Sequence, residues 1–122
     1  MTNRNILLLG AVFMALAVLF GAFGAHALKK ILSPEMLTIY HTGVEYQFYH
    51  ALGLLAVGTI GLQYPSKWIR LSGIFLVAGI ILFSGSLYVL SLSGIKVLGA
   101  ITPIGGISFV IGWILLAVGI YK

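Results

Sequence analysis

The sequence predicts an all-α integral membrane protein, a bundle of four transmembrane helices. Of its 122 residues, 61% are hydrophobic and 7% are charged, and the mean hydropathy is +1.15. Soluble domains carry about 25% charged residues, so this composition cannot supply a water-compatible surface. The length leaves room for four spans of about 20 residues joined by short turns. We therefore expect a single transmembrane domain over residues 1–122.

The first predicted span covers residues 6–28 and follows Arg4. Its apolar run is longer than the core of about 7 to 15 residues in a cleavable signal peptide. We therefore expect the span to be retained, although Ala25-His26-Ala27 resembles a cleavage site. Gly21 and Gly24 add small residues that allow a neighbouring helix to approach closely.

The second predicted span covers residues 40–62, within a helix that begins near residue 34. Ser33-Pro34-Glu35 is a strong helix start, because Ser can cap, Pro suits the first turn and Glu favours the positive end of the helix dipole. Nothing interrupts the pattern before Tyr64-Pro65. Such a helix is about 43 Å long and exceeds the hydrocarbon core of about 30 Å. Its first turns are therefore expected in the headgroup layer.

The third and fourth predicted spans cover residues 68–92 and 97–121. Ser66 is expected to cap the third helix, and the turn at residues 93–96 separates the two spans. Pro103 lies near the start of the fourth span. Because proline lacks a backbone donor, we expect it to bend or loosen that helix.

Four spans place both chain termini on one side of the membrane. The cations are scattered at the ends of the apolar runs, as expected for anchors at the lipid headgroups and not for a nucleic-acid surface. The positive-inside rule gives a slim preference for cytoplasmic termini. The terminal side holds Arg4, Lys67, Arg70 and Lys122, and the other side holds Lys29, Lys30 and Lys96.

The segment from Tyr40 to Gly58 concentrates the ionisable residues of the chain. It holds two of the three histidines and one of the two acidic residues. An ionisable side chain inside a membrane span is costly, so it indicates a pairing, a pathway or a site. We predict a polar intramembrane cluster, serving either packing or function, that consists of His26, Tyr46, Gln47, His50, Ser86, Tyr88 and Thr102.

His50 has three interpretations. A neutral imidazole could form hydrogen bonds to other helices, with Ser84, Ser86, Tyr88 and Thr102 as candidate partners. It could instead handle protons or a substrate, since imidazole titrates near neutral pH. Ligation of a metal or haem is the third interpretation. We favour the first.

His41 and Glu45 lie one helical turn apart near the predicted membrane edge. We expect an ion-pair group there, formed by His41, Glu45, Lys29 and Lys30. These two residues could alternatively bind zinc together with His26, but the pattern is not H-E-x-x-H and the chain has no cysteine. We therefore expect no metal and no cofactor.

The remaining motifs indicate packing and not catalysis. The chain contains no phosphate-binding loop, serine nucleophile elbow or paired carboxylates, so we expect no catalytic residue. We predict helix packing or a kink at Gly21, Gly24, Gly85, Pro103, Gly105 and Gly106.

Four segments together resemble a known family of small bacterial membrane proteins. They are GAFGAH (21–26), YHTGVEYQFYHALGLL (40–55), FSGSLYVL (83–90) and LGAITPIGG (98–106). The family is domain-of-unknown-function family 423, also called uncharacterised protein family 0382, and transmembrane protein 256 of animals is a distant relative. The resemblance implies a four-helix protein of the bacterial inner membrane with no established biochemical activity.

The family motif would fall on thirteen positions of this sequence. Ala27 stands where relatives often have Gly, and Glu45 lies outside the pattern. The positions are Gly21, Gly24, Ala25, His26, Tyr46, Gln47, His50, Gly85, Ser86, Tyr88, Thr102, Pro103 and Gly106.

Three functional hypotheses remain open. The first is a bundle that supports membrane integrity or binds a partner, as a homo-oligomer or with other membrane proteins. The second is a small transporter or proton-coupled channel that uses His26, Gln47 and His50. The third is a haem- or metal-binding membrane protein that uses His26 and His50.

Overall fold

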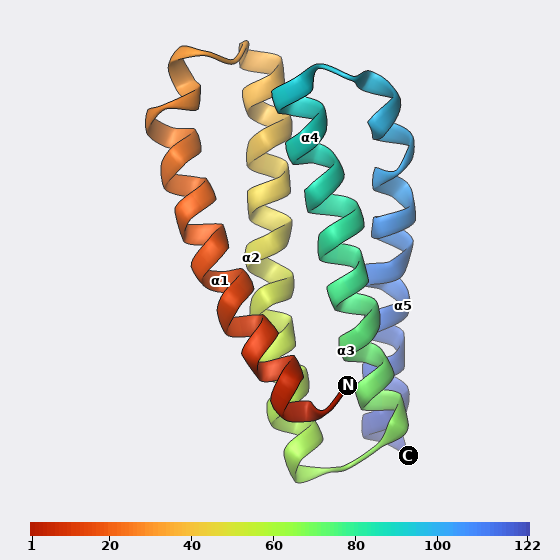
Figure 1. Ribbon diagram of the computed structural model, residues 1–122. Helices are drawn as coiled ribbons and strands as arrows, with labels where there is room; N and C mark the ends of the chain where they lie inside the picture. The colour runs from red at the N-terminus through yellow and green to blue at the C-terminus, as the bar shows by residue number, and fades with distance from the viewer.

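The computed structural model describes residues 1–122 and consists of four helical rods with no strand (Figure 1). The first two rods are α1, Asn3–His26, and α2, Pro34–Gln63. The third rod joins α3, Lys67–Gly79, and α4, Gly85–Ser93, and the fourth is α5, Thr102–Tyr121. Short 3-10 turns, Leu28–Lys30 and Lys96–Ala100, follow the first and third rods. The predicted all-α four-helix fold is confirmed.

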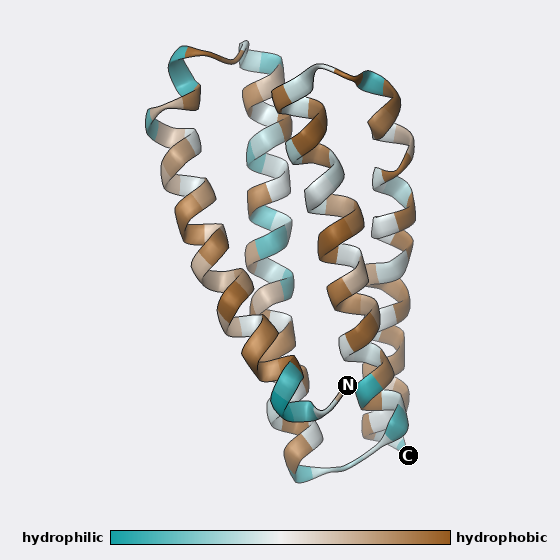
Figure 2. Ribbon diagram, viewed as in Figure 1, coloured by the Kyte–Doolittle hydropathy of each residue, from teal (hydrophilic) through white to brown (hydrophobic).

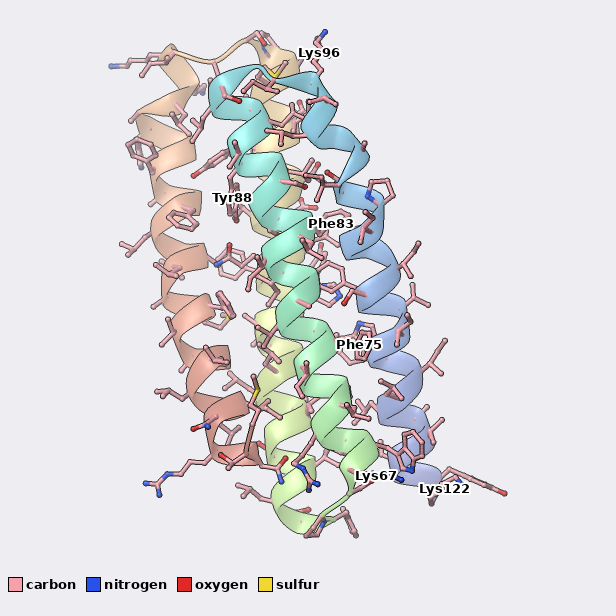
Figure 3. The ribbon with its side chains drawn as sticks, turned by 45° about the vertical axis from the view of Figure 1, so that its right-hand side comes forward. Lys67, Phe75, Phe83, Tyr88, Lys96 and Lys122 are labelled. Carbon is pink, nitrogen blue, oxygen red and sulfur yellow. The ribbon has the colours of Figure 1, made fainter.

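The rods run alternately up and down, so both chain termini lie at the same end of the bundle (Figure 1). Lys67 and Lys122 lie at this end, and Lys96 lies at the opposite end (Figure 3). The cations therefore flank the apolar middle, as membrane anchoring requires. Cytoplasmic location of the termini stays a prediction.

Three of the four rods are long and apolar enough to cross a membrane. They are Asn3–Lys30, Lys67–Ser93 and Lys96–Tyr121. α2 does not meet this criterion, because polar residues interrupt its middle, as its pale and teal segments show (Figure 2). It nevertheless lies within the bundle and packs against α1, α3 and α4. The span over residues 40–62 therefore stays a prediction that depends on how the polar groups of α2 are paired.

The predicted helix starts are confirmed. The Ser33 Oγ accepts a hydrogen bond from the backbone N–H of Met36 at 3.2 Å, so α2 begins at Pro34. The Ser66 Oγ accepts from the N–H of Trp68 at 3.2 Å, at the start of α3. At the other end of the third rod, Gly94 adopts a left-handed conformation, with φ of 75°, and ends α4.

The third and fourth rods depart from regular α-helix in two places. Residues Ile80–Ser84 form a π-helical segment between α3 and α4, a feature that helical periodicity alone does not reveal. Pro103 lies in the first turn of α5, where its missing N–H would have no partner within the helix. The fourth span is thus loosened into a 3-10 turn just before Pro103, where the α-helix begins, and a bend within α5 stays a prediction.

The apolar core is divided between the two ends of the bundle. Its larger part lies towards the termini and contains Ile6, Leu54, Val57, Ile69, Leu76, Ile80, Phe109 and Leu116. A smaller cluster of Leu28, Tyr40 and Val44 lies towards the opposite end. The polar side chains of α2 and α4 lie at the levels between these clusters, and they form the candidate site.

Candidate functional site

Gln47 connects three helices through its side-chain amide. Its Nε2 donates to the backbone carbonyl of Phe13 on α1 at 2.8 Å, and its Oε1 accepts from the Tyr88 hydroxyl on α4 at 2.6 Å. The side chain is 2% exposed. Both ends of the amide are therefore paired inside the bundle, which removes most of the cost of placing it in hydrocarbon.

Ser86 and Thr102 join the third rod to the start of the fourth. Their hydroxyl oxygens are 2.6 Å apart, and the Ser86 Oγ also donates to the Phe83 carbonyl at 2.9 Å. Because Ser86 donates to that carbonyl, the hydrogen between the two hydroxyls comes from Thr102. The sequence predicts both residues as cluster members, and the structure brings them together. They form a pair separate from Gln47 and Tyr88.

Three further hydroxyl groups tie helices together through backbone carbonyls. Ser84 donates to Gly43 at 2.6 Å, Ser108 donates to Phe75 at 2.7 Å, and Tyr40 donates to Phe20 at 2.6 Å. None of these three contacts is predicted from the sequence. A polar residue on an otherwise apolar helix face suggests that its hydroxyl bonds to another helix. It does not identify the carbonyl that accepts the bond.

His50 is buried but bonds to no other helix. Its Nδ1 is 2.7 Å from the carbonyl oxygen of Tyr46, one turn earlier on α2. Since a carbonyl only accepts, Nδ1 carries the proton in this bond. The imidazole stacks on Phe109 of α5 with ring centroids 3.5 Å apart and an interplanar angle of 11°. The predicted bonds from His50 to Ser84, Ser86, Tyr88 or Thr102 are therefore wrong.

Aromatic rings fill the space between α2 and α5 around His50. Tyr46 packs on Phe83 with ring centroids 4.6 Å apart, and Trp113 lies 5.8 Å from the imidazole. Tyr46 thus belongs to the surroundings of His50 through its ring and its carbonyl. The role of His50 in the structure is that of a flat aromatic ring with one internal hydrogen bond.

The histidine of the first helix lies outside the cluster. His26 is exposed in the last turn of α1. It is thirteen residues beyond Phe13, or about 20 Å along the helix from the level of Gln47. The prediction that His26 joins the intramembrane cluster is therefore wrong, because the cluster forms at the middle of α1 and not at its end.

The predicted edge ion-pair group does not form either. Glu45, Lys29 and Lys30 are exposed, and His41 is half-buried against the ring of Tyr40. No group of three His, Asp or Glu side chains is close enough to hold a metal ion. The alternative zinc site of His26, His41 and Glu45 is therefore not assembled.

The predicted packing glycines fall into two groups. A Cβ on Gly24 would collide with the Tyr40 ring, and a Cβ on Gly105 would collide with the backbone of Leu82 and Phe83. In contrast, a Cβ on Gly21 would meet Val44 at an ordinary 3.5 Å, and on Gly106 it would meet Phe83 at 3.8 Å. Gly85 has nothing within 4 Å. Gly24 and Gly105 are thus the close-contact positions, and the packing role of Gly85 is not supported.

The hollows of the molecule do not open into a polar path. A groove of about 350 Å³ between α3 and α5 is lined by hydrophobic residues apart from Ser108. A groove of about 220 Å³ between α1 and α4 reaches Gln47 and Tyr88, whose polar groups are already bonded to each other. The one strongly polar hollow, about 570 Å³, lies at the terminal end beside Lys67 and Lys122.

Comparison with known proteins places the chain among small membrane proteins. The family model described as "Protein of unknown function (DUF423)" matches residues 20–106. The UPF0382 membrane protein SSP2132 of Staphylococcus saprophyticus is 46% identical over 118 residues, covering 95% of this chain and 96% of the relative. UPF0382 membrane protein YwdK of Bacillus subtilis is also 46% identical, over 117 residues and 95% of both chains.

A relative of somewhat lower identity comes from Escherichia coli. The UPF0382 inner membrane protein YgdD of Escherichia coli K12 is 41% identical over 119 residues, covering 98% of this chain and 91% of the relative. No solved structure matches the chain. The matched segment includes Gln47, His50, Tyr88 and Thr102, and the apolar helices agree with the membrane location in the names of the relatives. The chain is thus a membrane protein that belongs to the DUF423 family.

Proposed function

We propose that this protein acts as a structural or partner-binding element of the membrane, and that its intramembrane polar residues hold a fixed arrangement of helices. The observation that carries the proposal is the Gln47 amide, which is 2% exposed and bonded to α1 and α4 at once. A side chain with both ends engaged supports packing more than exchange with a substrate.

The other polar groups support the same interpretation. The hydroxyls of Ser84, Ser108 and Tyr40 each donate to a carbonyl of another helix. Interhelical hydrogen bonds in membranes contribute about 0.6 kcal/mol each on average and up to about 1.7 kcal/mol. Together with the close approach at Gly24 and Gly105, they favour one arrangement of the rods over others.

The transporter hypothesis receives less support. Its path requires His26, Gln47 and His50 along one route, but His26 is exposed at the end of α1. The groove beside Gln47 has an almost wholly apolar lining, and water has few groups to bind there. Haem or metal binding through His26 and His50 fares no better, because the two lie at different levels of the bundle.

A rescue experiment separates the structural proposal from proton handling. In cells that lack their own copy, uptake of a membrane-impermeant DNA dye reports on the membrane barrier. We expect the wild type and His50→Phe to restore the barrier equally, because phenylalanine keeps the stack on Phe109. Gln47→Leu should restore it poorly, because it breaks both amide hydrogen bonds.

The same variants give the contradicting result in vesicles. If the purified wild type collapses an imposed pH gradient and His50→Phe does not, the imidazole moves protons and the structural proposal is wrong. Tyr121→Phe, a change at an exposed position in the last turn of α5, serves as the matched control for altering one ring in a reconstituted protein.

A further inference from the structure

α2 presents a polar face to the outside of the bundle. Residues spaced three and four apart form one stripe along a helix, and on α2 all of them are exposed except Thr42, which is half-buried. We call these residues the α2 outer stripe: Thr38, Thr42, Glu45, Tyr49, Leu52, Ala56, Thr59 and Gln63.

Glu45 and Tyr49 of this stripe lie close to the middle of α2, so Glu45 is deeper along the helix than the membrane edge where the sequence predicts it. α2 has 30 residues, so its midpoint falls between Phe48 and Tyr49 and Glu45 is about 5 Å away along the axis. The neighbouring helices agree on this level: Gln47 bonds to Phe13, near the midpoint of α1. A hydrocarbon core of about 30 Å centred on this level encloses both side chains.

Within the stripe, only these two residues have polar groups at that depth without a partner in the chain. The hydroxyls of Thr38, Thr42 and Thr59 donate to carbonyls one turn earlier, at 2.9, 3.1 and 2.7 Å. Gln63, the last residue of α2, lies at the membrane edge. The Tyr49 ring is 56% exposed and Glu45 is exposed. An acidic group facing lipid near the bilayer centre is costly to insert, so this face is unsuited to lipid.

We infer that the α2 outer stripe is the contact surface for a second copy of this chain. The inference names a partner for the proposed structural function and rests on it. Copies inserted in the same sense are related by a two-fold axis along the membrane normal, so each presents the same stripe at the same depth. The stripe carries a hydrogen-bond acceptor, the carboxyl of Glu45, and a hydrogen-bond donor, the hydroxyl of Tyr49. Each can therefore be paired by the other residue on a second copy.

The geometry of a helix brings these two groups closer to one level. Helical side chains lean towards the N-terminus, and the Tyr49 side chain is longer than that of Glu45, so the Tyr49 hydroxyl lies nearer the level of the Glu45 carboxyl than the two Cα atoms do. Across a parallel pair, each Tyr49 hydroxyl donates to Glu45 of the partner subunit, which gives two reciprocal hydrogen bonds. Thr42, Ala56 and Thr59 are small, which lets the two α2 backbones approach.

Oxidative cross-linking in native membranes tests the contact, since the chain has no cysteine of its own. The test variant is Leu52→Cys, inside the stripe and 53% exposed, and the matched control is Ile114→Cys on α5, 57% exposed. We expect a disulfide-linked dimer at least about ten times more abundant for Leu52→Cys. Equal cross-linking at the two positions, or linkage of Leu52→Cys to a different protein, overturns the inference.

The polar pair is tested with purified protein in vesicles, by counting subunits through single-molecule photobleaching. Glu45→Gln keeps an acceptor oxygen and should preserve the dimer, whereas Glu45→Leu and Tyr49→Phe should raise its dissociation constant about tenfold. A wild-type monomer, or a dimer unaffected by both substitutions, contradicts the inference. A monomer whose His50→Phe variant still restores the membrane barrier would leave the proposed function standing.

Discussion

The Tyr88 hydroxyl donates to Oε1 of Gln47 at 2.6 Å, and this contact joins α4 to α2 across 41 positions of sequence. The same amide reaches α1 through Phe13. In hydrocarbon, an unpaired polar group has no water with which it can form a hydrogen bond. The two contacts therefore let α2, the least apolar of the rods, lie among its neighbours.

Two adjacent glycines should respond differently to the same substitution. In Gly105→Ala the added methyl meets the backbone of Leu82 and Phe83, which cannot rotate away, whereas in Gly106→Ala it meets only the Phe83 ring at 3.8 Å. We expect Gly105→Ala to lower the free energy of unfolding by about 2 kcal/mol or more, and Gly106→Ala to leave it nearly unchanged. Unfolding by SDS in bicelles measures both. Equal effects would mean that α5 is rotated differently about its axis.

His50 should be replaceable by a ring but not by a methyl group. His50→Ala leaves a void beside Phe109 and should cost about 2 to 4 kcal/mol of unfolding free energy. His50→Phe keeps the stack and should stay within about 1 kcal/mol of the wild type. Ile114→Ala, at an exposed site on α5, is the control for loss of side-chain volume. A large loss in His50→Phe would show that the imidazole nitrogens, and not the ring, determine stability.

Ser84→Ala should weaken the contact between α2 and the π-helical segment. It removes the hydrogen bond from the Ser84 hydroxyl to the Gly43 carbonyl, 2.6 Å long and fully buried. The expected loss is about 0.5 to 1.5 kcal/mol of unfolding free energy. Ser93→Ala should lose less, because the exposed Ser93 hydroxyl donates to Val89 and accepts from the N–H of Ile95, both close by in sequence and not on another helix. An equal loss in both variants would indicate a propensity effect and no helix–helix bond.

The sidedness of the termini is open to a direct test. The terminal end carries Arg4, Lys67, Arg70 and Lys122, and the positive-inside rule places such an end in the cytoplasm. A reporter that works only in the cytoplasm should be active when fused after Lys122. Activity restricted to a reporter that works only outside the cell would reverse the orientation.

The sequence predicts the helices well because the signals are local. Ser33 and Ser66 cap the helices that were expected to begin after them. The apolar runs form helical rods of the expected length. Gln47 and Tyr88, both predicted as members of the polar cluster, are hydrogen-bonded to each other. A buried amide in a membrane segment must be paired, but the sequence does not say with which residue.

Contacts between helices are harder to predict from the sequence than the helices themselves. Spacing tells which face of a helix a residue occupies, but not which neighbour lies opposite, so His50 is matched with hydroxyls when it in fact stacks on Phe109. The π-helical segment shifts the rotation of α4 relative to α3. Gly105 meets the backbone of Leu82 and Phe83 within this segment, whereas Gly85, just after it, has nothing within 4 Å. No residue type in Ile80–Ser84 predicts a π-helical turn.

A double-mutant cycle on Gln47 and Tyr88 tests the central claim most directly. The unfolding free energies of the wild type, Gln47→Leu, Tyr88→Phe and the double variant are measured in the same bicelles. Pairing inside the bundle predicts a coupling energy of about 0.6 to 1.7 kcal/mol in favour of the native pair. A coupling energy of zero would show that the two side chains do not hold α2 and α4 together, and would contradict the account.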